Sequence, residues 1–446
     1  MKHSRRLSRR DFLKTSAALG AGLTLSQSLP ALARTRRQDD ELVMWWWGEQ
    51  ELPGLQAWVD DTVAAYTGAK VSAMLQNTDV VISQFQTAAA ANEAPDVQFL
   101  WNGIYHMESV WFGYLAPLNG LVDQAVLDRS GATRLSFYQG DQYRIGWYPL
   151  PMIWEYNKDV FDAAGLDADN PPKTWDALLD ACDKIKTSGV DPIGGGVQDG
   201  FWGEWYLGHA LAQSLDSPSE ALDLFIGDLD FREPKYHEFW VRLEELKTSG
   251  FLNDSMSSLE LYPGIDLVVT GQLGMSESIG TRVPADNDTL NGRVGVMTMP
   301  VFGTGALAGK PILDSQGLGI SSQTEQKEQA AAFLEFMHAP EQLAKFWELT
   351  HWMPADSTWD SSVIDAPIVQ QLWDGWVTSA DSIPYIPNLM PAQFWTDAMF
   401  VASQEIIAGT MTGEAAGDLA ARVVQEWRDF NPDLVENYQK WADDLR

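Results

Sequence analysis

Cysteine is almost absent from the 446-residue sequence and occurs once, at Cys182. A single cysteine excludes an intrachain disulfide and any zinc or iron–sulfur site that is built from several thiolates. We expect Cys182 to be a small, buried apolar side chain on a helix. The six histidines do not show the spacing of metal ligands. We therefore expect no metal and no cofactor.

Basic residues are scarce, with 30 Lys and Arg against 62 Asp and Glu, which gives a formal net charge of −32. The chain after residue 33 is more acidic still, because residues 1–33 hold six basic residues and one acidic residue. A negative field of this size repels nucleic acid and anionic membrane surfaces. Hydrophobic residues make up 45% of the chain, which is enough to form packed cores. We expect a folded protein with no nucleic-acid partner.

Long apolar runs are also missing, and the most apolar N-terminal stretch has the parts of an export signal. Arg9 and Arg10 in "SRRDFLK" precede the mildly apolar "TSAALGAGLTLSQSLPALA", which ends in small residues at 31–33. The arginine pair is typical of the Tat route, and we expect residues 1–33 to be a Tat signal peptide. The stretch is too short and too polar to span a bilayer. No cysteine lies at the cleavage point, so we expect a soluble periplasmic protein without a lipid anchor.

Strand and helix patterns alternate along the rest of the chain. Residues 41–47, 69–75 and 96–101 have the composition of strands, and residues 55–66 between the first two have helical spacing of apolar side chains. Thr174 is a favourable N-cap for a helix that places Trp175 and Cys182 on one face and ends at Gly189. This alternation predicts an α/β fold with parallel sheets covered by helices. The length exceeds what one hydrophobic core holds, so we expect two lobes.

Tryptophan is abundant, with 20 residues, and three of them are consecutive in "ELVMWWWGEQ". In open α/β sheets, ligands bind beyond the carboxyl ends of the strands. Trp47 and Glu49 follow the first predicted strand, and Trp101 and Asn102 end the third. An indole offers a flat apolar face, and a carboxylate or amide bonds hydroxyls, which together suit a sugar ring. The alternative is that Trp45 and Trp47 share one face of the strand and only pack in the core.

Ordered motifs along most of the chain resemble those of one protein family. They include "APDVQFLWNG", "GYLAPLNGLVD", "IWEYNKDVFDAAGLDADNPPKTWDALLDACDKI", "VVTGQLGMSESIG", "VGVMTMP", "GLGISS", "AAAFLEFMHAPEQLAKFWELTHWMPAD" and "YIPNLMPAQFWTDAMFVASQEIIAGTMTGEAA". The chain resembles the extracellular solute-binding proteins of carbohydrate ABC importers, the group that includes maltose-binding protein. The resemblance implies a protein that captures a sugar or polyol and delivers it to the importer, and that makes or breaks no bond.

The resemblance also implies a two-lobed periplasmic-binding-protein fold, in which each lobe is a mainly parallel sheet covered by helices. Three hinge crossings are expected near 148–153, 313–317 and 364–371. The expected N-terminal lobe comprises 39–150 and 318–365, and the expected C-terminal lobe comprises 151–317 and 366–446. Ligand would close the lobes by hinge motion, and the closed form would dock on the permease subunits. We expect the protein to act as a monomer.

The site residues that the resemblance implies come from both lobes. The first lobe supplies Trp47, Glu49, Trp101 and Asn102. The second lobe supplies Asp199, Phe201, Trp202, Glu277, Ser278 and Trp395. The indoles would stack on sugar rings, and the carboxylates would accept hydrogen bonds from hydroxyls. Two alternatives stay open. An exported glycoside hydrolase would use two of the many acidic residues, and a polyamine-binding protein would use the same aromatic and acidic groups for a cation.

Overall fold

The computed structural model describes residues 41–78 and 80–446, so the predicted signal peptide lies outside the described residues. The main sheet has nine strands and contains both parallel and antiparallel pairs. Its order is β2 (Lys70–Leu75), β1 (Glu41–Trp46), β3 (Val97–Leu100), β10 (Ile312–Ile320), β6 (Ile145–Asn157), β8 (Leu273–Ile279) and β7 (Asp191–Ile193). β11 (Ile383–Pro384) pairs with β10, and β9 (Val294–Met297) pairs with β6. A separate hairpin joins β4 (Phe137–Tyr138) and β5 (Asp141–Gln142).

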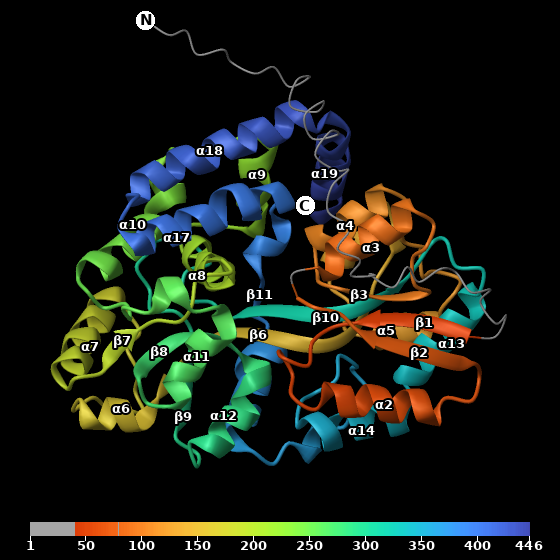
Figure 1. Cartoon of the computed structure of the whole chain (residues 1–446), viewed down its shortest axis with the longest axis horizontal. Coiled ribbons are helices and arrows are strands. Elements are labelled where there is room, and N and C mark those ends of the chain that lie inside the picture. Colours follow the sequence, from red (N-terminus) through yellow and green to blue (C-terminus); the bar gives the residue numbers. More distant parts are fainter. Residues whose placement is uncertain (1–40, 79) are drawn as a thin grey trace, which may run out of the picture. The chain divides into compact units, whose positions relative to one another are not determined.

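The long strands β6 and β10 run side by side through the middle of this sheet (Figure 1). The β1–β3 and β7–β8 pairs are parallel, whereas β10 is antiparallel to β3 and to β6, and β6 is antiparallel to β8. Every residue of β6 is buried. The expected crossings at 148–153 and 313–317 lie within β6 and β10, and the third, at 364–371, includes the start of α15 (Pro367–Leu372). Their action as hinges stays a prediction.

Helices surround the strands on both sides of this central pair (Figure 1). Those near β1–β3 are α2 (Leu55–Ala65), α3 (Val81–Ala90), α4 (Ile104–Trp111), α5 (Gln124–Arg129), α13 (Lys327–Met337) and α14 (Pro340–Thr350). Those on the side of β7–β8 are α6 (Lys158–Ala163), α7 (Trp175–Thr187), α8 (Phe201–Ala212), α10 (Pro234–Thr248), α11 (Leu261–Val269), α12 (Val283–Thr289) and α17 (Phe400–Ala408). Helix α18 (Gly413–Phe430) packs on α10 and α17, and α9 (Pro218–Ile226) packs on α18. The last helix, α19 (Pro432–Leu445), packs on α4, α9 and α18. The described helices therefore cover the sheet as the sequence pattern predicts.

Short helical turns complete the chain between these elements. The 3₁₀ turns are η1 (Arg134–Ser136), η2 (Met256–Ser258), η3 (Gly280–Arg282), η4 (Ser361–Val363) and η6 (Ile386–Leu389). Two π-helical segments are η5 (Trp373–Val377) and η7 (Trp395–Met399), and η7 follows the short α16 (Ala392–Phe394). Such π segments often occur at functional sites.

Helix α7 shows how the local sequence determines an element. The Thr174 hydroxyl accepts a hydrogen bond from the backbone N–H of Ala177, which confirms the predicted N-cap. The buried face includes Trp175, Cys182 and Ile185, as the spacing of apolar residues predicts. Cys182 is unpaired and buried on this helix, which confirms the prediction, and burial raises the pKa of its thiol.

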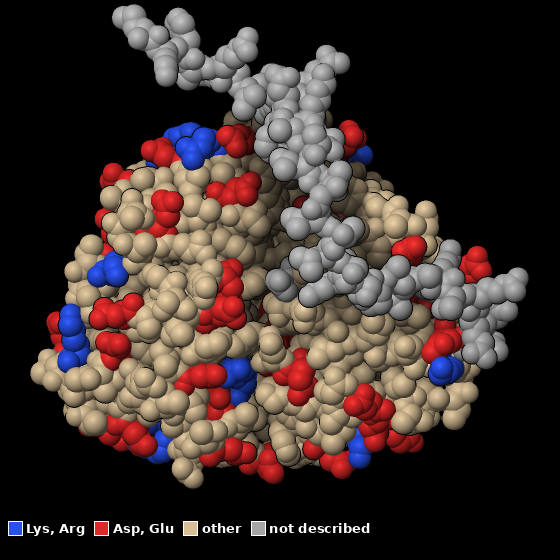
Figure 2. Space-filling model, viewed as in Figure 1, with Lys and Arg blue, Asp and Glu red and all other residues tan. Residues whose placement is uncertain are grey.

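Two clusters of buried apolar side chains form the core of the described part. One includes Leu42, Met44 and Trp46 of β1 together with residues of α2, α13 and α14. The other includes most of the buried residues of α8, α10 and α18. Two clusters agree with the expectation that the chain exceeds a single core. Acidic side chains far outnumber basic ones on the visible face of the molecule (Figure 2).

Candidate functional site

A cavity of about 790 Å³ opens where the segments after β1 and β3 face α8, α11 and η6–η7 across the two long strands. Its volume lies within the range of about 300–1,000 Å³ that is usual for small-molecule sites. We call this cavity the cleft. Its lining comprises Trp47–Glu51, Leu75–Thr78, Trp101, Tyr105, Leu150, Met152, Asp199, Phe201, Glu204, Trp205, Glu260–Pro263, Asp266, Arg282, Asp314, Gln316, Tyr385, Asn388 and Trp395.

A continuous row of four aromatic side chains lines the cleft. The ring centroids of Trp47 and Trp101 are 5.1 Å apart, those of Trp101 and Tyr105 are 5.4 Å apart, and those of Tyr105 and Trp395 are 4.4 Å apart. The Trp47–Trp101 and Tyr105–Trp395 pairs are edge-to-face, which is a favoured arrangement of aromatic rings. We call these four residues the aromatic row. Strand β1 ends at Trp46, so Trp47 belongs to the loop that enters the cleft.

Three carboxyl groups lie buried at the cleft and are called the buried acid cluster: Glu51, Glu204 and Asp314. Each accepts hydrogen bonds from uncharged donors. Glu51 accepts from the Tyr148 hydroxyl at 2.9 Å and from the Gln316 amide at 3.0 Å. Burial raises the pKa of all three carboxyl groups, and the charge of Asp314 raises the pKa of Glu51 and of Glu204 further. A cation or a hydrogen-bond donor placed among these groups would favour their ionised form.

The other two members of the cluster share a neighbouring segment, because Tyr385 and Asn388 both belong to or adjoin η6. The Tyr385 hydroxyl donates to Glu204 Oε1 at 2.6 Å. The side-chain amides of Asn102 and Asn388 both donate to Asp314 Oδ1, at 3.0 and 2.8 Å. Gly103 approaches Asn388 closely, because a Cβ on Gly103 would lie 2.2 Å from the Asn388 carbonyl oxygen. This glycine has a φ of +65°, which only glycine adopts without strain.

Six of the ten predicted site residues line the cleft: Trp47, Glu49, Trp101, Asp199, Phe201 and Trp395. The carboxylates of Glu49 and Asp199 also hold backbone. Glu49 accepts hydrogen bonds from the N–H groups of Gly54 and Gln56 at the start of α2. Asp199 accepts from the N–H groups of Phe201 and Leu261, where α8 and α11 begin. These two carboxylates therefore also stabilise the helix ends that border the cleft.

The other four predicted residues, Asn102, Trp202, Glu277 and Ser278, are buried and are not in the cleft lining. Asn102 lies behind Asp314 and orients it through the hydrogen bond described above. The Trp202 indole stacks on Tyr206 and donates to Ser276. The Ser278 hydroxyl donates to Glu155 at 2.8 Å. The structure therefore gives these side chains partners inside the protein.

Glu277 lies in a buried polar group between β6, β8 and α8. Its Oε2 is 2.7 Å from Nδ1 of His209, and its Oε1 accepts a hydrogen bond from the Trp154 indole at 2.5 Å. Burial raises the pKa of Glu277. Burial alone would lower the pKa of His209, but the charge and hydrogen bond of Glu277 reverse this, and the pKa is raised. These opposite charges hold each other inside the core.

Sequence reasoning did not identify Glu51, Tyr105, Glu204, Asp314 and Tyr385 as site residues, although they line the cleft. Asp314 interrupts the otherwise weakly polar strand "ILDSQGLGI", and Glu204 lies in the mainly apolar helix "FWGEWYLGHALA". A charged residue inside an apolar element is rarely buried without a partner. That pattern was the available signal for these two positions.

A prediction follows for the pH dependence of stability. The pKa of buried Glu51 is raised from 4.5 to about 8, first by burial. Between these values the folded protein keeps a proton that the unfolded chain releases, so the free energy of unfolding falls as pH rises, by about 1.4 kcal/mol per pH unit for one such group. In Glu51→Gln this contribution disappears. We expect the free energy of unfolding of the variant, measured with denaturant, to fall less steeply with pH between about pH 5 and pH 7.5, by about 1.4 kcal/mol per pH unit.

The side chains around Glu51 can accommodate this change. The amide oxygen of Gln316 has no hydrogen-bond partner within the described structure, and it can turn toward the new amide group. Glu93→Gln is the matched control, because Glu93 is exposed. The prediction is contradicted if the free energy of unfolding of Glu51→Gln falls with pH as steeply as that of the unsubstituted protein.

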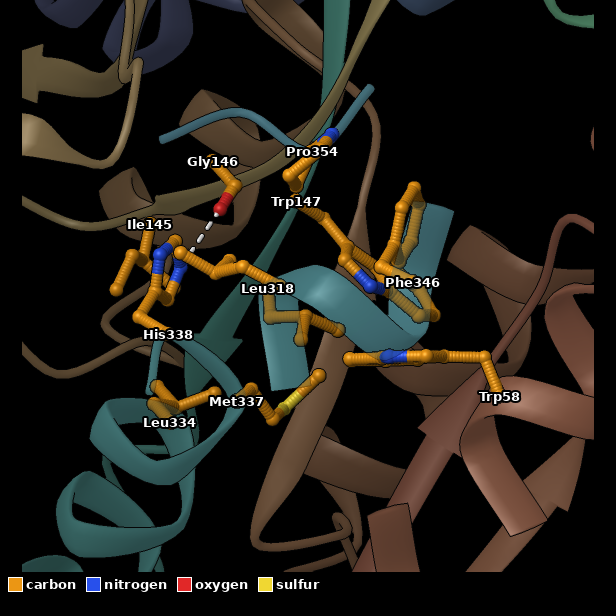
Figure 3. A pocket seen from close by; sticks show the side chains of 11 residues that line it. Trp58, Ile145, Gly146, Trp147, Leu318, Leu334, Met337, His338, Phe346 and Pro354 are labelled. Atoms are coloured by element: carbon orange, nitrogen blue, oxygen red, sulfur yellow. Dashed lines mark hydrogen bonds between the residues drawn. The ribbon is translucent and has the colours of Figure 1, made fainter. Parts of the chain in front are cut away.

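A second cavity, of about 10 Å³, lies in the core formed by β6, β10, α13 and α14. Figure 3 shows it enclosed by apolar side chains, among them Trp58, Leu318 and Met337, with Nε2 of His338 3.0 Å from the carbonyl oxygen of Gly146. This volume holds about one water molecule. This second cavity is therefore too small for a solute, whereas the cleft is large enough for one.

The described residues contain no group of three or more His, Cys, Asp or Glu side chains that could hold a metal ion. Within residues 41–78 and 80–446, no helix combines the length and the apolar character that crossing a membrane requires.

Comparison with known proteins identifies two regions of the chain. Residues 6–26 match the Tat pathway signal sequence, which agrees with the predicted export to the periplasm. Residues 46–344 match the bacterial extracellular solute-binding protein family. A relative is the sn-glycerol-3-phosphate-binding periplasmic protein UgpB of Rhizobium meliloti (strain 1021), which is 26% identical over 298 residues. That alignment covers 66% of this chain and 64% of the length of the relative.

Solved structures share the fold at lower identity. A chitin oligosaccharide binding protein superimposes with a TM-score of 0.77 and 22% identity, over 86% of this chain and 98% of that chain. A solute-binding protein of an ABC transporter from Thermotoga lettingae, bound with α-D-tagatose, gives a TM-score of 0.71 and 21% identity, over 87% and 99%. The predicted two-lobed α/β fold is thereby confirmed. Because the family match covers well over half of the sequence, the chain belongs to the bacterial extracellular solute-binding proteins.

Proposed function

We propose that the cleft binds a saccharide or polyol, and that the loaded protein delivers this ligand to the membrane permease subunits of an ABC importer. The observation that carries the proposal is the aromatic row beside the buried acid cluster. Indole and phenol rings can cover the C–H faces of sugar rings, and the carboxyl groups can bond their hydroxyls. A cavity of about 790 Å³ has room for a sugar of this kind.

The relatives support a binding function. The relatives and solved structures named above are described as binding proteins, for an oligosaccharide, tagatose or glycerol 3-phosphate. We infer that this chain acts in the same way, as a monomer and without catalysing a reaction. The residues that we propose to contact the ligand are the six predicted residues in the cleft lining, together with Tyr105, Glu204 and Asp314.

Ligand closure would involve the two long strands. We propose that 39–150 and 318–365 form one lobe and that 151–317 and 366–446 form the other. Strands β6 and β10 each contain an expected crossing between these lobes. Small changes in their backbone angles would then open and close the cleft.

The proposal is tested by the melting temperature of the purified protein with mono- and oligosaccharides, polyols, polyamines and amino acids. A ligand that binds only the native state raises stability by about 2.7 kcal/mol at a hundredfold excess over Kd. We expect at least one saccharide or polyol to raise the melting temperature. We also expect chromatography of the same mixtures to show no reaction product. A rise with polyamines alone, or turnover of a glycoside, would overturn the proposal.

A further inference from the structure

The charges around the cleft are strongly one-sided. Its lining holds seven carboxyl side chains, Glu49, Glu51, Asp199, Glu204, Glu260, Asp266 and Asp314, and one basic side chain, Arg282. That guanidinium already donates to Asp266, and its Nε lies 3.8 Å from Asp286. No lysine belongs to the lining. An anionic ligand such as a phosphate ester would meet an unfavourable field without a free cation to pair with.

The buried acid cluster has uncharged direct partners. The hydrogen-bond donors are the hydroxyls of Tyr148 and Tyr385 and the amides of Gln316, Asn102 and Asn388. Buried Arg144 acts on Asp314 through its charge, but it donates its hydrogen bonds elsewhere, including to the carbonyl oxygens of Leu100 and Ser315. Three carboxyl groups that repel one another in a buried place are stabilised by a cation that binds among them.

A further acceptor lies at the same place. Gln316 is 1% exposed and lines the cleft, and its Oε1 has no hydrogen-bond partner in the described structure. Its amide nitrogen is used by Glu51. An unpaired buried acceptor costs free energy, which a ligand donor would recover. The cleft therefore combines excess negative charge with an acceptor oxygen that has no hydrogen-bond partner. Both features favour a ligand that donates hydrogen bonds.

We propose that the natural ligand is a saccharide that carries a protonated amine, bound with its ammonium group among Glu51, Glu204, Asp314 and Gln316. An ammonium has three donors and no acceptor, so it matches a site of carboxyl and amide oxygens. The sugar ring would lie against the aromatic row, as in the proposed function on which this inference rests. The ammonium would also allow the cluster to ionise, so that binding near neutral pH releases protons.

The test compares ligands that differ in the amine. Calorimetric titrations of the purified protein at about pH 7 would use β-1,4-linked glucosamine oligosaccharides, the N-acetylated oligosaccharides and the equivalent glucose oligosaccharides, with spermidine and glycerol 3-phosphate as further probes. Charge-assisted hydrogen bonds are roughly twice as strong as neutral ones, so we expect the aminated sugar to bind at least about tenfold more tightly than its neutral counterparts. Titrations in two buffers of different ionisation enthalpy would show proton release for the aminated sugar alone.

Substitutions in the buried acid cluster identify the carboxyl groups that cause the preference for the aminated sugar. Glu204→Gln and Asp314→Asn keep the size of the side chains and their acceptor oxygens, and each should reduce the preference for the aminated sugar by about tenfold. The exposed Glu93→Gln removes one charge outside the cleft lining and should leave the preference unchanged. Should one isosteric variant fail to fold, the other and the proton release still test the inference.

The outcomes separate the two proposals. If neutral sugars bind as tightly as aminated ones, or if glycerol 3-phosphate binds more tightly, the amine inference is overturned, and binding of any neutral saccharide would leave the proposed function standing. If neither these saccharides nor any saccharide or polyol of the melting-temperature panel binds, or if spermidine alone does, the proposed function is overturned as well.

Discussion

Replacing Trp101 by alanine will weaken saccharide binding by about ten- to a hundredfold, which corresponds to about 1.4–2.8 kcal/mol. The indole is the centre of the aromatic row, where it contacts Trp47 on one side and Tyr105 on the other. Trp101 is half-buried, so its loss removes ligand-facing surface along with packing. Titration calorimetry with the saccharide that gives the largest thermal shift measures the change.

Trp395 is the second member of the aromatic row to be replaced. Its substitute must be larger than alanine, because Trp395 also packs inside the protein. It is buried, and its indole donates to the carbonyl oxygen of Met390, so Trp395→Ala would also cost about 3–5 kcal/mol of stability. Trp395→Phe keeps an aromatic face and should weaken binding less than Trp101→Ala does. Trp359→Ala is the control, because Trp359 packs on Trp347 and Trp373 outside the cleft lining. Unchanged affinity in Trp101→Ala would contradict the assignment of the aromatic row.

Local elements of the fold could be predicted from the sequence because their signals are local. The apolar spacing and the cap at Thr174 predict α7, and the strands at β1, β2 and β3 follow from short apolar runs between helical patterns. The antiparallel pairing of β10 with β3 and β6 could not be predicted in this way. It joins segments more than 150 residues apart, and a strand's own pattern does not specify its partner.

The candidate site could be predicted only in part, for a related reason. The rule that ligands bind beyond strand ends correctly located Trp47 and Trp101 in the cleft lining. A family motif, by contrast, locates a segment but does not say which face each side chain takes. In β8, "LGMSESI" is buried along its whole length, so Glu277 and Ser278 both point into protein. Asp314 and Glu204 come together at the cleft only through tertiary contacts, since they lie 110 residues apart.

The buried position of Glu277 leads to the second large expected effect, which is on stability. His209→Leu will lower the free energy of unfolding by about 3–5 kcal/mol, because it leaves the Glu277 carboxylate without its charged partner inside the core. His209 lies one helical turn after Trp205, which lines the cleft on the same helix. The His209–Glu277 pair therefore connects α8 to β8, and through the Trp154 indole to β6.

The loss in His209→Leu should depend on pH. Burial already raises the pKa of Glu277, and His209 limits that rise. Without His209, the folded protein holds the Glu277 proton to a higher pH while the unfolded chain releases it near pH 4.5, so the destabilisation should grow from about pH 5 to about pH 8. Denaturant unfolding at several pH values measures this.

A double-mutant cycle decides whether the two residues act as a pair. Glu277→Gln keeps an acceptor for the Trp154 indole and removes the charge, so we expect His209→Leu with Glu277→Gln to be more stable than His209→Leu alone. Additive losses would show that the two residues stabilise the core independently. Glu277→Gln should leave ligand affinity nearly unchanged, because Glu277 is not in the cleft lining. A large loss of affinity in this variant would instead support the role of Glu277 as a ligand residue that the sequence resemblance implies.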